Sequence, residues 1–436
     1  MKRKITGFIG AMLIGMGMQA QNWVNDTISM GTSSINDVYY SLANGTVRTE
    51  GNKNWHLGFS LSIADSAAIW ANHNASNSFV KVYNIHKDSS QWSTVTLNDT
   101  LTASLCYNND KGWYQGALND VYSTDIFNYG WGTYDQSTHK ILGDSIFIVK
   151  ANGVFYKVFI NELDAVTMNW AISVGDIVAN TSYTDTIKKQ VGFTNRLFAY
   201  YDLAAQKDTN REPEIATWDI LFTRYTTDDP TSGQNPHNSV LGVLANTNGS
   251  SGVRVARAYM ILEDDALADY NTYLASLSPV ISSVGFNWKT FDLASFTYFV
   301  EDSNSYFIKD RNGIYYQLQF TGFSGINGPG SGTTSFRKRL LAPVNVHNVN
   351  SLVAAYSVSP VPASNYIDIM MDSKAAGAVT ISLLDMQGRI VRTASISLKQ
   401  GVNGYTLPVS ELPNGNYLIN IQGKQVKLTQ KVSIAH

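Results

Sequence analysis

An internal repeat constrains the fold of this chain more than any other feature. A tryptophan followed by alternating apolar residues occurs twice, within residues 52–60 and within residues 216–225. A Tyr-Tyr pair precedes both runs, and a second tryptophan segment and an Asn-Gly segment follow both in the same order. All four landmarks keep an offset of about 160 residues, which chance does not supply. The sequence therefore predicts a tandem duplication of one domain, over residues 21–190 and 191–341.

The tryptophan-led runs have the period of a β-strand. In residues 218–225, Trp218, Ile220 and Phe222 recur at every second position, which predicts a strand that places all three on one packed face. Trp55, with the apolar residues after it, repeats the pattern. Trp131 and Trp288 also recur in both copies, so these four rings are expected in the core.

Turn signals and a single helical segment complete the fold prediction. Asn152-Gly153 and Asn312-Gly313 supply the two left-handed residues of a type I′ turn, so each copy is expected to contain a hairpin there. Residues 263–277 begin with three acidic residues and predict the one helix. The remainder consists of short strands and turns, and the predicted fold class is all-β.

The amino terminus predicts export. Lys2, Arg3 and Lys4 precede a short apolar run that ends before Ala20, as in a secretory signal peptide over residues 1–20. No later segment approaches the roughly 20 apolar residues of a membrane-spanning helix. The single cysteine, Cys106, excludes an internal disulfide and a cysteine-ligated cluster, and is expected to be buried.

Charge separates the chain into a body and a tail. Residues 21–354 hold 22 Lys/Arg and 30 Asp/Glu, whereas residues 355–436 hold seven and four. An acidic body is a poor electrostatic match for nucleic acid or for an anionic membrane surface. The basic tail is expected to be a separate module.

The tail has the pattern of a small β-sandwich. A linker is predicted over residues 342–354, and short alternating strands separated by turns fill residues 355–436. Three motifs stand out: SPVPAS at 359–364, DMQGR at 385–389 and LPNGNY at 412–417. These motifs can belong to an ordinary terminal β-sandwich that binds carbohydrate, or to a C-terminal domain of a known family.

With these motifs the tail resembles the type A C-terminal sorting domain of the type IX secretion system. Pro-Val-Pro stands where the family usually has Pro-Asn-Pro. The resemblance implies recognition by the type IX translocon, removal of the domain by its sortase-like machinery, and a secreted or cell-surface destination reached through the periplasm. The residues that carry it are Pro360, Pro362, Gly388, Arg389, Leu412, Gly415 and Tyr417.

The body is similar to the HmuY-like family through its Tyr-Tyr pair, the segment WDILFTRY, the segment VGFNWKTF and the Asn-Gly hairpin. The second copy carries this pattern well. The first copy is degenerate, because His56 stands where the second has Asp219, and Ser60 where it has Thr223. The resemblance implies an all-β protein on the cell surface, and the founding member of the family captures haem.

This resemblance also implies candidate haem ligands. In haem-binding members two axial ligands come from loops after the tryptophan strand, which points to His73 and His86 in the first copy and to His237 and Met260 in the second. Loop or surface side chains are the alternative explanation for all of them. The tryptophans without a partner in the other copy are free to line a stacking surface; they are Trp23, Trp70, Trp92, Trp113 and Trp170.

Known hydrolase and nucleotide-binding motifs are absent from the sequence, so the chain is predicted to be a binding protein and not an enzyme. Haem capture is one candidate function, and a surface adhesin or glycan-binding protein is another. An enzyme with a nonlocal site is the third, and it would place carboxylates or histidines together in one cleft.

Overall fold

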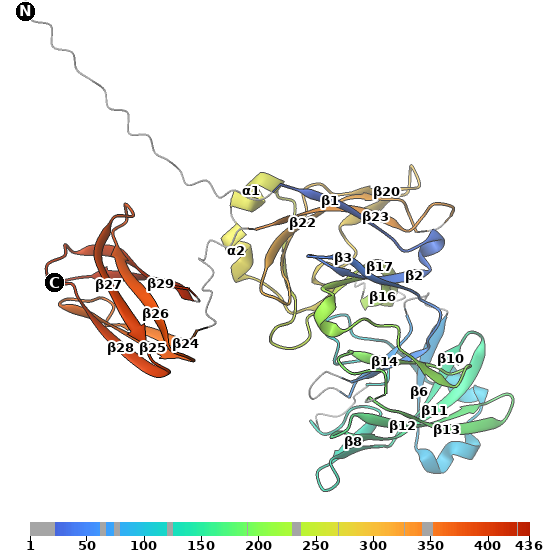
Figure 1. The fold of residues 1–436 in the computed structure, drawn as a ribbon. Coiled ribbons are helices and arrows are strands. Elements are labelled where there is room, and N and C mark those ends of the chain that lie inside the picture. Colours follow the sequence, from blue (N-terminus) through green and yellow to red (C-terminus); the bar gives the residue numbers. More distant parts are fainter. Residues whose placement is uncertain are drawn as a thin grey trace, which may run out of the picture. The chain divides into compact units, whose positions relative to one another are not determined.

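The computed structural model describes residues 22–61, 67–73, 79–119, 125–189, 191–228, 237–268, 270–326, 328–341, 352–424 and 426–436. The predicted signal peptide and most of the predicted linker lie outside them. The chain forms two compact units, a body within Ala20–Leu341 and a tail within Ala342–His436. Both units are built almost entirely from antiparallel strands (Figure 1), which confirms the all-β prediction.

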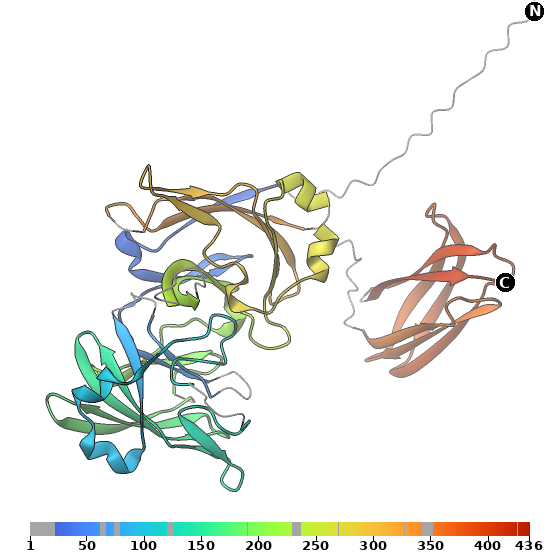
Figure 2. The same cartoon turned by 180° about the vertical axis from the view of Figure 1, so that it is seen from behind.

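The body consists of two β-sandwiches, half A and half B, seen from opposite sides in Figures 1 and 2. In half A, an eight-stranded sheet faces a four-stranded one. The larger sheet contains β6 (Val80–Lys87), β7 (Ser104–Cys106), β8 (Gly132–Asp135), β9 (Lys140–Gly143), β10 (Ile146–Ala151), β11 (Val154–Asp164), β12 (Asn169–Asp176) and β13 (Thr181–Ile187). The smaller contains β4 (Leu57–Ser60), β5 (Ile69–Ala71), β14 (Phe198–Asp202) and β15 (Lys207–Thr209).

Half B repeats this arrangement with a five-stranded and a four-stranded sheet. The first contains β1 (Val24–Ser29), β18 (Arg254–Ala258), β21 (Ser305–Lys309), β22 (Tyr315–Phe323) and β23 (Thr333–Leu340). The second contains β2 (Asn36–Ser41), β3 (Gly45–Gly51), β16 (Ile220–Asp228) and β17 (His237–Ala245). A separate hairpin pairs β19 (Lys289–Asp292) with β20 (Thr297–Val300).

The two halves exchange their first three strands. The order β3-β2-β16-β17 in half B matches the order β15-β14-β4-β5 in half A, and β1-β23-β22-β21-β18 matches β13-β12-β11-β10-β6. Strands β1 and β2 of the first sequence copy pair with β23 and β16 of the second, and β3 extends β2. In the other direction, β14 of the second copy pairs with β4 of the first, and β15 extends β14. Strand β13, at the end of the predicted first copy, pairs with β12. The predicted copies are therefore not the packed halves.

Equivalent contacts recur on both sides of this exchange. The Tyr40 hydroxyl donates to Asp26 Oδ2 at 2.6 Å, and the Tyr201 hydroxyl donates to Asp185 Oδ2 at 2.7 Å. Because β13 takes the place of β1, the second repeat begins at β13 and not at the predicted residue 191. The shared Asp-Thr-Ile of β1 and β13 is the sequence signal for this boundary.

Three large apolar cores, beside two smaller clusters, hold the described part of the body together. One lies inside each half, and a third lies between the two four-stranded sheets. Trp131 and Trp288 fill the cores of the halves, while Trp55 and Trp218 lie in the third, the junction core. The four recurring tryptophans are thus buried as predicted. Trp218 does not share a core with Ile220 and Phe222, however, because it precedes the start of β16.

Three of the five tryptophans that lack an equivalent in the other copy are buried, so the prediction that they are free to line a stacking surface is wrong for them. Trp70 and Trp113 lie in the junction core, and Trp170 lies in the core of half A. Trp23 and Trp92 are half-buried. Trp70 and Trp113 therefore add to the junction core from half A alone, beside the equivalent pair Trp55 and Trp218.

The two predicted Asn-Gly hairpins both form, but only one has the expected turn. Asn152 and Gly153 both have positive φ, as a type I′ turn requires. The second turn is wider, because Asp310 Oδ1 accepts the backbone N–H groups of Asn312 and Ile314. The predicted helix is present as α1 (Glu263–Ala268) and α2 (Tyr270–Ala275). Cys106 is buried, as expected.

The tail is the predicted antiparallel β-sandwich, with its own core. One sheet contains β24 (Val353–Ser359), β25 (Tyr366–Ser373) and β28 (Gly401–Pro408). The other contains β26 (Gly377–Leu384), β27 (Ile390–Leu398), β29 (Gly415–Gly423) and β30 (Val426–Ile434). Because β24 begins at Val353, the module starts slightly before the predicted residue 355.

Candidate functional site

Two of the four candidate ligand residues, one from each sequence copy, meet where the halves join. His73 follows β5 in half A, and His237 begins β17 in half B. Both line a small cavity of about 110 Å³. The Tyr107 ring stacks on the His237 ring with centroids 4.0 Å apart, and its centroid lies 5.7 Å from that of His73.

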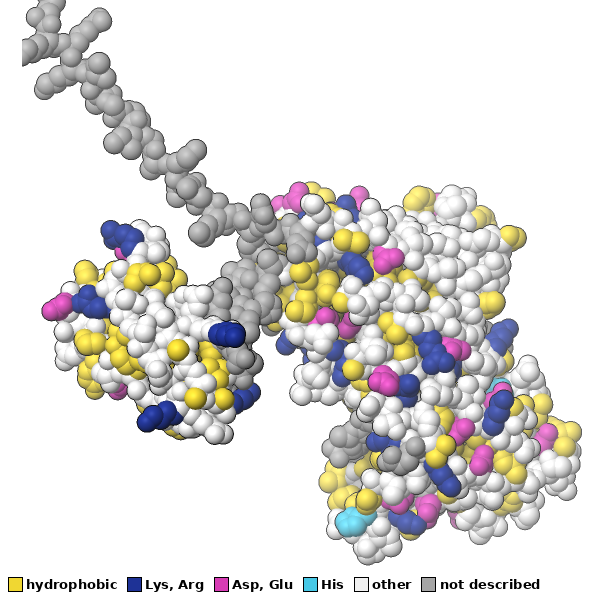
Figure 3. All heavy atoms as spheres, in the orientation of Figure 1, with side chains coloured by type: hydrophobic (Ala, Val, Ile, Leu, Met, Phe, Trp, Pro, Cys, Tyr) yellow, Lys and Arg dark blue, Asp and Glu magenta, His cyan; other side chains and the backbone are white. Residues whose placement is uncertain are grey.

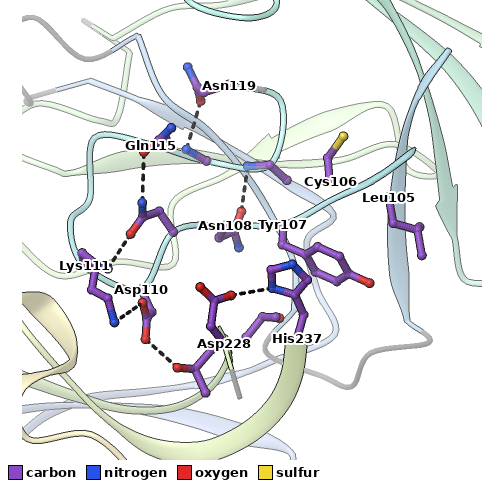
Figure 4. Close-up of a pocket in the computed structure, with 15 residues that line it drawn as sticks. Leu105, Cys106, Tyr107, Asn108, Asp110, Lys111, Gln115, Asn119, Asp228 and His237 are labelled. Atoms are coloured by element: carbon purple, nitrogen blue, oxygen red, sulfur yellow. Dashed lines mark hydrogen bonds and ion pairs between the residues drawn. The ribbon is translucent and has the colours of Figure 1, made fainter. Parts of the chain in front are cut away.

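A larger cavity of about 340 Å³ opens beside this aromatic cluster, and we call it the junction pocket (Figure 4). Half A contributes the segment after β7, and half B contributes the ends of β16 and β17. Its lining residues are Leu105, Cys106, Tyr107, Asn108, Asn109, Asp110, Lys111, Gln115, Gly116, Ala117, Asn119, Thr226, Thr227, Asp228 and His237.

Strand pairing places the histidine of the pocket against a carboxylate. Asp228 and His237 are register partners at the end of the β16–β17 ladder. Asp228 Oδ1 lies 2.8 Å from His237 Nδ1 (Figure 4). The carboxylate therefore fixes the orientation of the imidazole, while 69% of the Asp228 side chain remains exposed to the pocket mouth and solvent.

A second carboxylate joins the two halves. The Thr227 hydroxyl of half B donates to Asp110 Oδ2 of half A at 2.6 Å, and Lys111 Nζ lies 3.0 Å from Asp110 Oδ1. Asp110 is 8% exposed, so its charge is held by these two partners. Hydrogen bonds to a charged group of this kind stabilise more than neutral ones.

Amide side chains hold the half A wall of the pocket in place. Asn108 Oδ1 accepts the N–H groups of Ala71 and Ala117, and its Nδ2 donates to the Ala71 carbonyl. Asn119 Oδ1 likewise accepts the N–H groups of Ile69 and Gly116. The segment after β7 is therefore fixed to β5, and β5 leads directly into His73.

His73 is the most strongly perturbed histidine of the site. Burial, followed by the charge of His237, lowers its pKa to about 4. Its Nδ1 has no hydrogen-bond partner among the described residues. His73 is therefore neutral at ordinary pH and carries an unused polar atom in the wall of the smaller cavity.

The other two candidates do not line either cavity. His86 lies near the exposed end of β6, and Met260 is 72% exposed in half B. Both residues have positive φ, which is uncommon for residues other than glycine. Of the four predicted ligands the structure brings together only His73 and His237.

The geometry at this pair does not fit a haem held between two axial ligands. The Tyr107 ring lies against the His237 ring, and His237 Nδ1 is taken by Asp228. The cavity that both histidines line, about 110 Å³, is small against the roughly 300–1,000 Å³ of typical ligand pockets. Within the described ranges, no group of three or more His, Cys, Asp or Glu side chains is placed to hold a metal ion.

The functional residues that the sequence did not indicate are Tyr107, Asp110 and Thr227. They come from segments that the repeat does not align, and they meet only because the two halves pack together. No local motif marks them. The only signal was indirect: Thr227 and Asp228 continue the tryptophan-led strand of the second copy to its exposed end at Asp228.

The sorting-motif residues of the tail lie at its turns and strand ends. Pro360 and Pro362 connect β24 to β25. Gly388 has a positive φ in the β26–β27 turn, where Asp385 accepts the backbone N–H of Arg389 and pairs with its guanidinium. The Tyr417 hydroxyl donates to the Pro413 carbonyl. Leu412 is buried just before β29, which begins at Gly415.

Comparison with known proteins identifies this tail. The family model of the secretion system C-terminal sorting domain matches residues 357–435. No curated protein sequence matches the chain. The resemblance of the body to the HmuY-like family therefore stays a prediction.

Solved structures resemble the chain only weakly. Dimeric latent PorU from Porphyromonas gingivalis shares 9% identity over 92% of this chain and 34% of its own, with a TM-score of 0.17. The BSP domain of a biofilm associated protein shares 11% over 87% and 80%, also with a TM-score of 0.17. An alpha-2-macroglobulin fragment from Escherichia coli shares 11% over 67% and 96%, with a TM-score of 0.16. Likenesses this low carry no argument about function.

The route of the protein follows from the tail. The helices of the described chain are too short or too polar to cross a membrane. The chain carries a secretion system C-terminal sorting domain, which supports its export by the type IX secretion system as a cell-surface or secreted protein.

Proposed function

We propose that the body is a non-enzymatic, surface-exposed binding protein whose junction pocket takes a short saccharide. The observation that carries the proposal is the junction pocket itself. Its wall combines carboxylate, ammonium, amide, hydroxyl and imidazole groups from both halves within about 340 Å³. Hydroxyl-rich ligands need such closely spaced donors and acceptors, and the volume lies in the range of small-ligand pockets.

Charge favours a neutral or amino sugar over an acidic one. Asp110 and Asp228 provide two carboxylates and Lys111 provides one ammonium group. His237, when neutral, leaves the pocket with a net negative charge. An acidic ligand would meet repulsion there. On the face of the body seen in Figure 3, basic and acidic side chains are interspersed.

Haem capture, the function that the family resemblance suggests, is the competing proposal. It requires Tyr107 to leave the ring of His237 and the small cavity to open. Titration of residues 21–341 with haemin separates the two proposals. A saturable, sharp Soret band that disappears in the His73→Ala or His237→Ala variant would support haem capture, whereas a broad and nonsaturating spectrum would rule it out.

The saccharide proposal is tested directly with short sugars. Thermal unfolding of residues 21–341 is measured with neutral, amino and acidic disaccharides. We expect neutral or amino disaccharides to raise Tm, and expect the Asp110→Asn and His237→Ala variants to lose that increase. A shift that persists unchanged in both variants, or no shift with any disaccharide, would overturn the proposal.

One observation supports an enzyme as a second candidate. The pairing of Asp228 with His237 Nδ1, close to a second carboxylate, is an arrangement used in acid–base chemistry. Release of reducing ends from oligosaccharides, lost in His237→Ala and Asp110→Asn, would establish it. Binding without release of reducing ends supports the non-enzymatic proposal.

A further inference from the structure

A second cavity lies on half A and shares no residue with the junction pocket. It measures about 600 Å³, and we call it the Trp92 groove. It is lined by Ser89, Trp92, Phe159, Asn161, Ser173, Ser182, Tyr183 and Thr184. None of these residues is acidic or basic. The groove therefore differs from the junction pocket in kind, combining aromatic rings with hydroxyl and amide groups.

Strand register builds the floor of the groove. Phe159 of β11, Ser173 of β12 and Thr184 of β13 are successive partners across the sheet. The neighbouring row contains Gly175 and Ser182. Small and hydroxylated residues on β12 and β13 thus leave a shallow surface beside the larger rings of Phe159 and Trp92.

Trp92 is held at the groove by the strands beneath it. Lys157 Nζ donates to the Trp92 carbonyl at 2.8 Å and lies 4.7 Å from the centroid of the indole ring. A Cβ at Gly175 would lie 3.1 Å from Trp92 Cζ2, so glycine there leaves room for the ring to approach the sheet. The indole is half-buried and fixed, which makes it a pre-organised stacking surface.

The segment that carries Trp92 is also fixed at its start. Ser89–Thr94 form a short 3₁₀ helix, and the Asp88 side chain accepts the Ser90 backbone N–H at 2.8 Å. Gln91 Oε1 in turn accepts the backbone N–H of Asp88. This capping arrangement limits motion of the ring before any ligand arrives.

We propose that the Trp92 groove binds one face of a neutral pyranose chain. A sugar ring presents an apolar face of C–H groups that suits Trp92 and Phe159, and hydroxyl groups at its edge that suit Asn161, Ser173 and Thr184. The lack of ionisable acids and bases in the lining selects against charged polymers, because an unpaired charge would lose solvation there. The proposal deepens the proposed saccharide function but uses a different set of residues.

A longer ligand distinguishes the groove from the junction pocket. Cellohexaose, a neutral hexasaccharide, is titrated into residues 21–436 by isothermal calorimetry. We expect saturable binding that weakens at least tenfold in Trp92→Ala. Trp23→Ala is the matched control, since Trp23 is also half-buried against cationic side chains, and it should leave cellohexaose binding unchanged.

A second variant tests the groove even if Trp92→Ala does not fold. Thr184 is exposed on the edge strand β13, so Thr184→Glu places a charge at the groove without disturbing its packing. It should weaken cellohexaose binding by a similar factor. Retention of wild-type affinity in both variants, or no binding of cellohexaose to the wild type, would overturn the groove proposal.

The two proposals fail in different ways. If cellohexaose binding is lost in Asp110→Asn and His237→Ala but not in Trp92→Ala, the junction pocket is the saccharide site and the groove proposal is wrong. If Trp92→Ala and Thr184→Glu abolish cellohexaose binding while no disaccharide raises the Tm of the wild type, the groove proposal stands and the proposed junction site is wrong.

Discussion

Two tyrosines meet at the centre of the body and show how single residues report the duplication. The hydroxyls of Tyr39 and Tyr200 lie 3.4 Å apart. Tyr39 packs edge-on against Trp218, and Tyr200 packs in the same way against Trp55. The repeat predicted that these residues are equivalent. It did not predict that equivalent residues touch, because a sequence pattern does not specify which copy a strand pairs with.

Asp219 and His56 occupy equivalent positions in the two copies. Their side chains differ chemically, but each accepts a hydrogen bond from a backbone N–H. Asp219 Oδ2 accepts the Leu42 N–H at 2.8 Å, and His56 Nδ1 accepts the Leu203 N–H at 3.0 Å. An Asp219→Ala substitution leaves a buried N–H unpaired, which costs about 1–3 kcal/mol. Urea unfolding should show this loss, and His56→Ala should show a loss of similar size. No change in either variant would contradict the structural role.

His73 makes the stability of the body depend on pH. Its folded-state pKa of about 4 lies below the ordinary value of about 6.5. Between these values the unfolded chain binds a proton that the folded chain does not, so the free energy of unfolding falls as pH falls from 6.5 to 4. The full effect is on the order of 3 kcal/mol.

Urea unfolding of residues 21–341 across this pH range measures the effect. His73→Gln should remove much of the loss below pH 6.5. The matched control is His86→Gln, at an exposed histidine of the same half, which should leave the profile unchanged. A His73→Gln profile identical to that of the wild type would show that His73 does not control it.

The strands themselves could be predicted from the sequence, but which of their faces are buried could not. The alternation in β4 and β16 identified both strands, but each is buried on both faces. This double burial arises because each four-stranded sheet packs against its own half on one side and against the junction core on the other. Alternation indicates one packed face and does not reveal a second.

The exchange of strands predicts an unusual effect of truncation. β1 pairs along its whole length with β23, the last strand of half B. Deletion of residues 22–30 should therefore open half B, far away in sequence, and leave half A protected. Hydrogen exchange should increase in β22 and β23, with β11 and β12 as the internal control. Increased exchange in β11 and β12 with protection of β23 would contradict the exchanged topology.

At the scale of the whole molecule, the chain resembles a dimer joined into one polypeptide. Each copy supplies three strands to the other, so an isolated copy lacks a complete pair of sheets unless it meets a second copy. Residues 181–341 expressed alone should form a homodimer, with β14 and β16 of different molecules in the places that β2 and β16 occupy here. Light scattering after gel filtration checks this, and a well-folded monomer would contradict it.

The tail could be predicted more completely than the body. Its strands pair with neighbours close in sequence, its motifs sit at its own turns, and the family comparison covers almost all of it. The junction pocket required contacts between residues more than a hundred positions apart, such as Asp110 and Thr227. The family resemblance therefore indicated His73 and His237 separately, while only the fold showed that they lie together.

The proposed function is saccharide binding by groups that the two halves of the body assemble together. Disaccharide titration of residues 21–341, comparing wild type with Asp110→Asn, tests it. We expect saturable binding of a neutral or amino sugar that weakens at least tenfold in the variant, with no low-spin haem spectrum on addition of haemin. Saturable haem binding by a protein that binds no sugar would contradict it.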